Sequence, residues 1–226
     1  LPLSASAILG GFLVQFYNFM MAVYCSDLMI GNYQAAVNFA VIITFFTTPI
    51  ATTLFPAFSK LDPKNEVETL RTVFQFSVKY ATLLTIPVTA AIMTLSEPLV
   101  SAIFGQKYTL APLFLTLYAI SYLYPAVGSL SLGNFLNGQG KTEVTMKLTL
   151  LNVTVGLPLS LALIPTFGIL GLITTTLVSG IPALATGLWW VKKHYQITVD
   201  WLSSAKICLS TGIAATTTYI ITSQLN

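Results

Sequence analysis

The chain has 226 residues, of which 55% are hydrophobic and only 8% are charged, with a formal net charge of +3 at pH 7. A soluble domain carries roughly 25% charged residues, so this composition excludes an ordinary soluble fold and indicates a membrane protein. The small net charge, without any run of Lys and Arg, also argues against nucleic acid as a partner.

Long uncharged stretches predict an all-α, polytopic membrane bundle of about seven transmembrane helices. A bilayer core of about 30 Å needs roughly 20 apolar residues per helix, and charges, glycines and prolines divide the chain into such segments. The segments are approximately 3–24, 33–55, 70–95, 110–135, 144–164, 170–190 and 205–221. We expect residues 1–190 to form one six-helix bundle, and residues 191–226 to add a cytoplasmic loop and one further transmembrane helix. Prolines inside five segments predict kinked helices: Pro49, Pro87, Pro125, Pro158 and Pro182.

The basic residues predict which helix ends face the cytoplasm. All of the ten Lys and Arg residues except Lys107 fall in or beside the second, fourth and sixth connections. Because cytoplasmic loops carry an excess of basic residues, we expect a multi-pass cell-membrane protein with its amino terminus inside and its carboxyl terminus outside. The chain begins with Leu and shows no signal peptide, which suggests a part of something longer.

No group of residues points to catalysis, to a metal or to a cofactor. The sequence GQGKT at 138–142 lacks the first glycine of a phosphate loop, because position 135 is Phe, and we interpret it as a turn. The only histidine, His194, follows two lysines at a helix end, and Cys25 and Cys208 are too far apart for a metal motif. We therefore expect free thiols, no enzymatic activity, no metal and no cofactor.

Polar side chains inside the predicted spans are the remaining functional signal, because membranes tolerate them mainly at helix contacts or around water-filled cavities. In the first span, Gly11, Gln15, Asn18 and Ala22 recur at helical spacing and form one small, amide-bearing face. This face either packs against another helix or lines a cavity. Asn38 in the second span is a similar but isolated candidate.

Lys79 and Gln75 form a second candidate site in the third span. Lys79 lies about two turns from the cytoplasmic end of that span, or roughly 10 Å deep at 1.5 Å per residue. Gln75 precedes it by four residues on the same helix face, so both side chains can donate to one partner. Two interpretations stay open: Lys79 snorkels to the headgroups, or it binds an anionic group in a wet cavity.

Five short stretches lie at turns between the predicted spans: DLMIGNYQAA (27–36), LFPAFSKL (54–61), IFGQKY (103–108) with the Ala-Pro that follows, GQGK (138–141) and PTFGILG (165–171). In this order they resemble turns in the second half of the polysaccharide and lipid-linked oligosaccharide flippases, which belong to the multidrug/oligosaccharidyl-lipid/polysaccharide exporter superfamily. The resemblance extends along nearly the whole chain.

This resemblance implies a transporter that flips polyprenyl-linked oligosaccharide or polysaccharide precursors by alternating access between two six-helix halves. The chain would be the C-terminal half of an inverted or paired two-bundle exporter. Its partners would be the lipid-linked sugar, the membrane lipids and a missing N-terminal half. From the residues themselves, we further hypothesise that Lys79, assisted by Gln75, contacts the lipid diphosphate in the inward-open state.

Two other functions remain open from the sequence. An ion-coupled exporter of drugs or organic cations would bury an acidic residue for its coupling ion, but Asp27, Glu97 and Asp200 fall at span ends. The third possibility is a truncated membrane protein that transports nothing.

Overall fold

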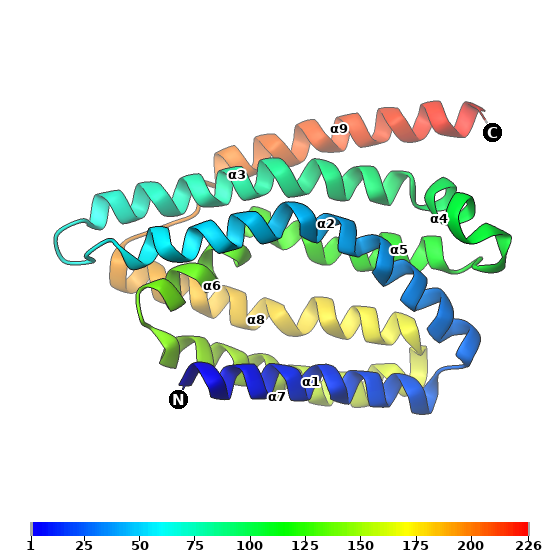
Figure 1. Ribbon diagram of the computed structural model, residues 1–226, viewed down its shortest axis with the longest axis horizontal. Helices are drawn as coiled ribbons and strands as arrows, with labels where there is room; N and C mark the ends of the chain where they lie inside the picture. The colour runs from blue at the N-terminus through cyan, green and yellow to red at the C-terminus, as the bar shows by residue number, and fades with distance from the viewer. Residues whose placement is uncertain (1, 226) are drawn as a thin grey trace.

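The computed structural model describes residues 2–225, and within them every regular element is a helix (Figure 1). The expected all-α fold class is confirmed. The elements are α1 (Pro2–Tyr24), α2 (Asp27–Ser59), α3 (Val67–Thr94), α4 (Ser96–Phe104), the 3₁₀ turn η1 (Gly105–Lys107), α5 (Ala111–Ala119), the 3₁₀ segment η2 (Ile120–Val127), α6 (Ser129–Gly138), α7 (Thr142–Phe167), α8 (Ile169–Tyr195) and α9 (Trp201–Leu225).

Five of the described helices are long and apolar enough to cross a membrane, namely α1, α2, α3, α7 and α8. A sixth crossing results if α5, η2 and α6 count as one span, which is bent by 54°. The seventh predicted span is present as the helix α9, but α9 is not among the helices that meet this criterion. The fold is thus a polytopic bundle, with the fourth predicted span broken in its middle.

The break in the fourth span has a local cause. Pro125 lies within η2, and Gly128 takes a left-handed conformation with φ of 90° before α6 begins. A side-chain carbon on Gly128 would also press on Val199 and Val78, at 3.2 and 3.4 Å. Only glycine suits both the backbone angle and this space, so the kink expected at Pro125 is present.

Successive spans run antiparallel, so the connections gather at two ends of the molecule (Figure 1). One end holds residue 2 and the connections 60–66, 139–141 and 196–200, and we call it the basic end. The other holds the α1–α2 turn, α4 with η1, and the α7–α8 turn. Lys107 lies at this far end, whereas the remaining basic residues belong to elements at or near the basic end.

The helix α2 holds the far end of the broken span. The side-chain oxygen of Asn32, which is 2% exposed, accepts hydrogen bonds from the backbone N–H groups of Leu110 and Ala111, both at 3.0 Å. These are donors that the start of α5 cannot satisfy within its own helix. The amide nitrogen of Asn32 donates to the Leu28 carbonyl at 2.8 Å, which fixes the side chain in this orientation.

The other end of α2 holds the end of α6. A side-chain carbon on Gly138 would lie 2.8 Å from the Phe58 Cβ and 3.0 Å from the Phe55 carbonyl oxygen, so the two backbones meet where only glycine fits. The side-chain nitrogen of Gln139 donates to the carbonyls of Phe58 and Leu61. The sequence GQGK therefore forms a turn that packs on α2, in agreement with its interpretation as a turn.

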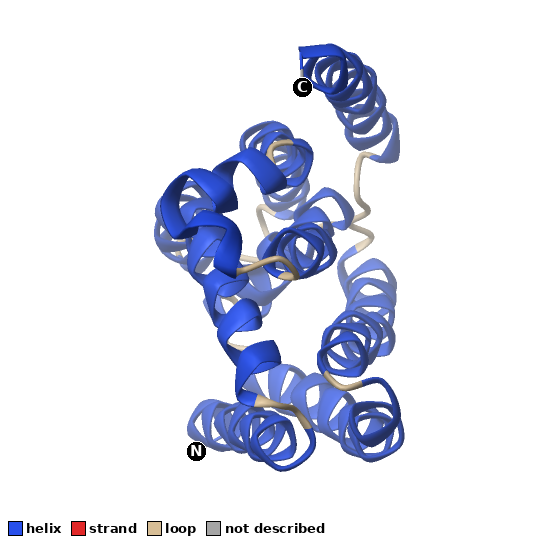
Figure 2. Cartoon of the chain, turned by 90° about the vertical axis from the view of Figure 1, so that its right-hand side faces the viewer, coloured by secondary structure: helices blue, strands red, loops and turns tan. Residues whose placement is uncertain are grey.

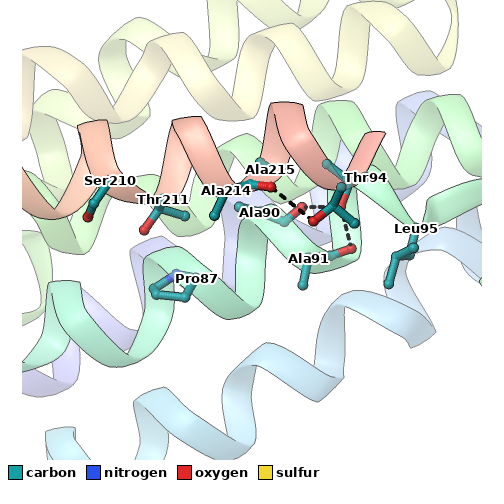
Figure 3. A pocket seen from close by; sticks show the side chains of 10 residues that line it. Pro87, Ala90, Ala91, Thr94, Leu95, Ser210, Thr211, Ala214 and Ala215 are labelled. Atoms are coloured by element: carbon teal, nitrogen blue, oxygen red, sulfur yellow. Dashed lines mark hydrogen bonds between the residues drawn. The ribbon is translucent and has the colours of Figure 1, made fainter. Parts of the chain in front are cut away.

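The remaining helices form two flanks (Figure 2). α1 packs on α7, which packs on α8, whereas α2 packs on α3, α5 and α6. α9 lies along α3 and has lesser contact with η2. The amino-terminal and carboxyl-terminal helices consequently lie at opposite edges of the molecule, as the end-on view shows.

Replacing Asn32 by Ala should lower the stability of the protein by about 1–3 kcal/mol, because two buried N–H groups lose their acceptor. The measurement is the thermal unfolding midpoint of purified protein in detergent. Asn38→Ala, an exposed amide on the same helix, is the matched control and should change little. Equal unfolding midpoints for the two variants would show that the hydrogen bonds of Asn32 to the start of α5 do not stabilise the protein.

The membrane orientation stays a prediction, and cysteine labelling tests it. In a variant without Cys25 and Cys208, a cysteine at Thr109 should react with a membrane-impermeant thiol reagent in intact cells, and one at Asn65 should not. Both positions are exposed, at the far and basic ends respectively. The reverse labelling pattern would invert the orientation that the basic residues indicate.

Candidate functional site

The amide-bearing face of α1 is not packed against the rest of the chain. Leu13, Tyr17 and Met20 are buried where α1 lies on α7. The residues Gly11, Gln15, Asn18 and Ala22 are all exposed, and at 3.6 residues per turn they lie on nearly the opposite side of the helix. This face therefore does not pack against another helix of the described chain, which was one of the two interpretations from the sequence.

α2 presents a similar exposed face. Asn38 is exposed together with Gln34, one turn earlier, and the same stripe continues as the apolar residues Val41 and Phe45. α1 and α2 are joined only by the short turn at Cys25 and Ser26, and from there the two helices diverge (Figure 1). Gln15 and Asn18 therefore lie on one diverging helix and Asn38 on the other.

The candidates on α3 face a different element, the connection 196–200 before α9. An Nη2 group of Arg71 donates to the Gln196 carbonyl at 3.1 Å, and the Gln75 amide donates to the Thr198 carbonyl at 3.4 Å. Four residues of helix advance about 6 Å and two residues of extended chain about 6.6 Å, so the two spacings match. Continuing the same spacing, the next α3 residue is Lys79 and the next residue of the connection is Asp200.

Lys79 and Asp200 interact electrostatically without a close ion pair. The pKa of the Asp200 carboxyl is held below its ordinary value, first by the side-chain and backbone groups of Ser203 and to a smaller extent by Lys79. Ser203 donates from its hydroxyl at 2.5 Å and from its backbone N–H at 3.2 Å, so Asp200 caps the start of α9 in its ionised form.

A small cavity of about 220 Å³ lies beside this pair. It is lined by Thr72, Gln75, Phe76, Lys79 and Asp200, and the Lys79 side chain is exposed. Gln75 already bonds the Thr198 carbonyl, whereas Lys79 forms no close salt bridge with any described residue. The structure thus brings Lys79 and Gln75 together on α3. The other candidates lie apart from them, on α1 and α2: Gln15, Asn18 and Asn38.

A buried polar cluster between α1, α7 and α8 was not expected from the sequence. The Tyr17 hydroxyl lies directly over Gly156, in space that any side chain there would fill, and the Ser179 Cβ is also in reach. The hydroxyl of Thr175 is buried without a hydrogen-bond partner among the described residues. Small and hydroxyl-bearing residues allow membrane helices to approach closely, and only the fold shows that three separate helices contribute them.

Acidic residues do not cluster at any of these candidate sites. Asp27 and Glu97 are exposed, and Asp200 is partly exposed at the start of α9. Within residues 2–225, no group of three or more His, Cys, Asp or Glu side chains is placed to hold a metal ion.

Comparison with known proteins finds similarity to proteins of polysaccharide biosynthesis. Residues 1–112 match the family model described as "Polysaccharide biosynthesis protein". The chain is 27% identical over 180 residues to the probable low-salt glycan biosynthesis flippase Agl15 of Haloferax volcanii, which covers 78% of this chain and 37% of that protein. It is also 27% identical over 129 residues to the lipopolysaccharide biosynthesis protein WzxC of Escherichia coli K12, covering 57% of this chain and 26% of that protein.

Together these similarities support a polysaccharide flippase family for this chain. A third relative is the uncharacterized membrane protein MJ1068 of Methanocaldococcus jannaschii, 22% identical over 164 residues, or 71% of this chain and 32% of that protein. No solved structure matches. The chain spans about a third of the length of the curated relatives that it matches. Its placement in a membrane as a multi-pass protein is confirmed.

The stretches that carry the resemblance to the flippases pack against one another. Within 27–36, a side-chain carbon on Gly31 would lie 3.9 Å from the Tyr108 ring of the 103–108 stretch, and Tyr33 meets Tyr118 edge to face at 6.0 Å between ring centres. In the same way 54–61 receives 138–141, as described above. The fifth stretch makes the α7–α8 turn, where Gly168 takes φ of 57°. These stretches are therefore structural contacts, and none of them is a substrate site by itself.

Proposed function

We propose that this chain is part of a transporter that flips lipid-linked oligosaccharide or polysaccharide precursors across the membrane by alternating access. The observation that carries the proposal is the exposed amide face of α1, with Gln15 and Asn18 on a helix whose other exposed residues are mostly apolar. Amides facing hydrocarbon are costly, so these groups point toward water or a polar ligand. The similarity to proteins named as a glycan biosynthesis flippase and a lipopolysaccharide biosynthesis protein supports a glycan as that ligand.

The pathway on this proposal is bounded on one side by α1 and α2 and on the other by helices outside this chain, which correspond to a second six-helix half. Amide side chains suit a sugar chain because each can both donate to and accept from hydroxyl groups. They carry no charge, so they hold a neutral sugar without the tight binding that would slow its release. Asn38 on α2 extends the same polar surface.

Replacing both amides of α1 tests this role. In the transporter that contains this chain, Gln15→Leu with Asn18→Leu should reduce complementation of a flippase-deficient strain about tenfold or more, as expected when a few polar contacts worth about 1 kcal/mol each are lost. Protein levels are measured in parallel. Thr154→Val is the control, since Thr154 is an exposed hydroxyl on α7 that bonds only its own helix.

The opposite outcome has a clear meaning. If α1 faces lipid, leucine at both positions should leave transport intact and raise stability, because apolar side chains are favoured in hydrocarbon. Full complementation by the double variant would therefore remove the support for a pathway along α1.

We also propose that Lys79, assisted by Gln75, contacts the diphosphate of the lipid carrier. Its ammonium is exposed beside a cavity of about 220 Å³ near the basic end, where a diphosphate of a membrane lipid would lie. An ammonium and a diphosphate form strong charge-assisted hydrogen bonds. The competing role of Lys79 is local: it would only stabilise Asp200 and the start of α9.

Two variants separate these roles of Lys79. Lys79→Ala should abolish or strongly reduce complementation at normal protein levels, and Lys79→Arg should retain part of it, because arginine keeps the charge. Asp200→Asn removes the local partner and should remain active. If Asp200→Asn fails as Lys79→Ala does, or if Lys79→Ala is fully active, the diphosphate contact is excluded.

A further inference from the structure

All three tryptophans of the chain gather where α8 ends and α9 begins. Trp189 and Trp190 lie in the last two turns of α8, and Trp201 is the first residue of α9. Trp189 and Trp201 are 58% and 57% exposed, which is unusual for side chains of this size. Tryptophan is enriched at the boundary between hydrocarbon and headgroups, so this junction lies at the membrane interface.

A sharp turn forms a cavity between these tryptophans. Gln196 takes a left-handed conformation with φ of 56°, and its N–H donates to the Lys192 carbonyl at 3.0 Å, so α8 ends and the chain folds back. Ile197 and Val199 then point into the core and are almost fully buried. The resulting cavity of about 240 Å³ is lined by Leu188, Trp189, Lys192, Ile197, Thr198, Val199 and Trp201.

This tryptophan cavity combines an apolar base with cations at its rim. Leu188, Ile197 and Val199 supply aliphatic surface, and the exposed Lys192 supplies an ammonium group. The Nζ of Lys193 lies 5.0 Å from the centre of the Trp189 ring, so a second ammonium is held at the same place by a cation–π contact. The chemistry that suits such a site is a phosphate group attached to a short length of hydrocarbon.

We propose that the tryptophan cavity binds the headgroup phosphate of an anionic membrane phospholipid. Basic pockets at helix ends hold such headgroups, whereas a peptide partner would leave the lipid-level tryptophans without a function. The cavity shares no lining residue with the one beside Lys79 and Asp200, although the connection 196–200 contributes to both. The site does not depend on the proposed transport function.

The lysines act by charge and by position. Lys192 follows Trp189 by three residues and Lys193 by four, so both extend along the face of α8 that Trp189 occupies. Each ammonium strengthens the binding of an anionic headgroup by about fivefold near a membrane surface. A zwitterionic headgroup gains less, because its own ammonium is repelled.

Intrinsic fluorescence reads this site directly, because Trp189 and Trp201 line the cavity and the third tryptophan, Trp190, is adjacent to Trp189 in the chain. The protein is placed in phospholipid nanodiscs in which the brominated lipid, a quencher, is either phosphatidylglycerol or phosphatidylcholine at the same fraction. Brominated phosphatidylglycerol should quench more strongly, as expected for a bound lipid that exchanges preferentially. In Lys192→Gln with Lys193→Gln, this preference should fall by about tenfold or more toward equal quenching.

The matched control is Lys60→Gln with Lys64→Gln, two exposed lysines at the same end but outside the cavity. This variant should keep the preference for phosphatidylglycerol. An equal loss in both variants would show a general surface charge effect and overturn the site, as would equal quenching by the two lipids in the unaltered protein. Circular dichroism confirms that each variant is folded.

A competition separates a membrane phospholipid from a prenyl diphosphate carrier. Farnesyl diphosphate is added to the nanodiscs that contain brominated phosphatidylglycerol. Quenching should persist when farnesyl diphosphate is present at a concentration equal to that of the brominated lipid. Relief of quenching at that concentration would assign the cavity to diphosphate carriers and overturn the phospholipid proposal.

Discussion

The double attachment of α2 to the broken span is the constraint on which the rest of this structure depends. Near one end, the buried Asn32 binds the free backbone N–H groups that begin α5. At the other end, Gly138 lets the end of α6 approach the α2 backbone, and Gln139 bonds the α2 carbonyls. A span that is bent by 54° is not held straight by continuous helical hydrogen bonding, and α2 fixes the positions of its two ends.

With this support, the interior of the bundle can carry polar contacts that lipid would not tolerate. The Ser77 and Ser131 hydroxyls meet at 2.7 Å where α3 packs against α6, and both residues are buried. The Tyr124 hydroxyl donates to the Leu177 carbonyl and connects η2 to α8. Because α2 is occupied by α3, α5 and α6, α1 packs on α7 instead, and the two helices diverge with their amide faces uncovered. The proposed transport pathway is a consequence of this division of contacts.

The connection 196–200 organises the basic end in a similar way. Its alternate residues Ile197 and Val199 are buried, while Arg71 and Gln75 bond the carbonyls of Gln196 and Thr198. One extended segment thereby fixes the start of α9, the surroundings of Lys79 and the tryptophan cavity. Phosphate chemistry is proposed on both sides of it, for a lipid carrier at Lys79 and for a structural phospholipid at Lys192. The two proposals concern separate cavities and can fail separately.

The sequence alone determined the class of the fold, the resemblance to flippases and the approximate spans, because a bilayer demands long apolar helices and turns demand glycine at fixed places. It also identified Gln15, Asn18 and Lys79 as unusual, since polarity inside a span is visible residue by residue. It did not reveal that Asn32 caps α5, 78 residues away, or that Gln75 bonds Thr198. Nor could it show that Tyr17, Gly156 and Ser179 meet between three helices. Only the tertiary structure decided these points, because helical periodicity places a residue on a face of its own helix and does not say which helix that face meets.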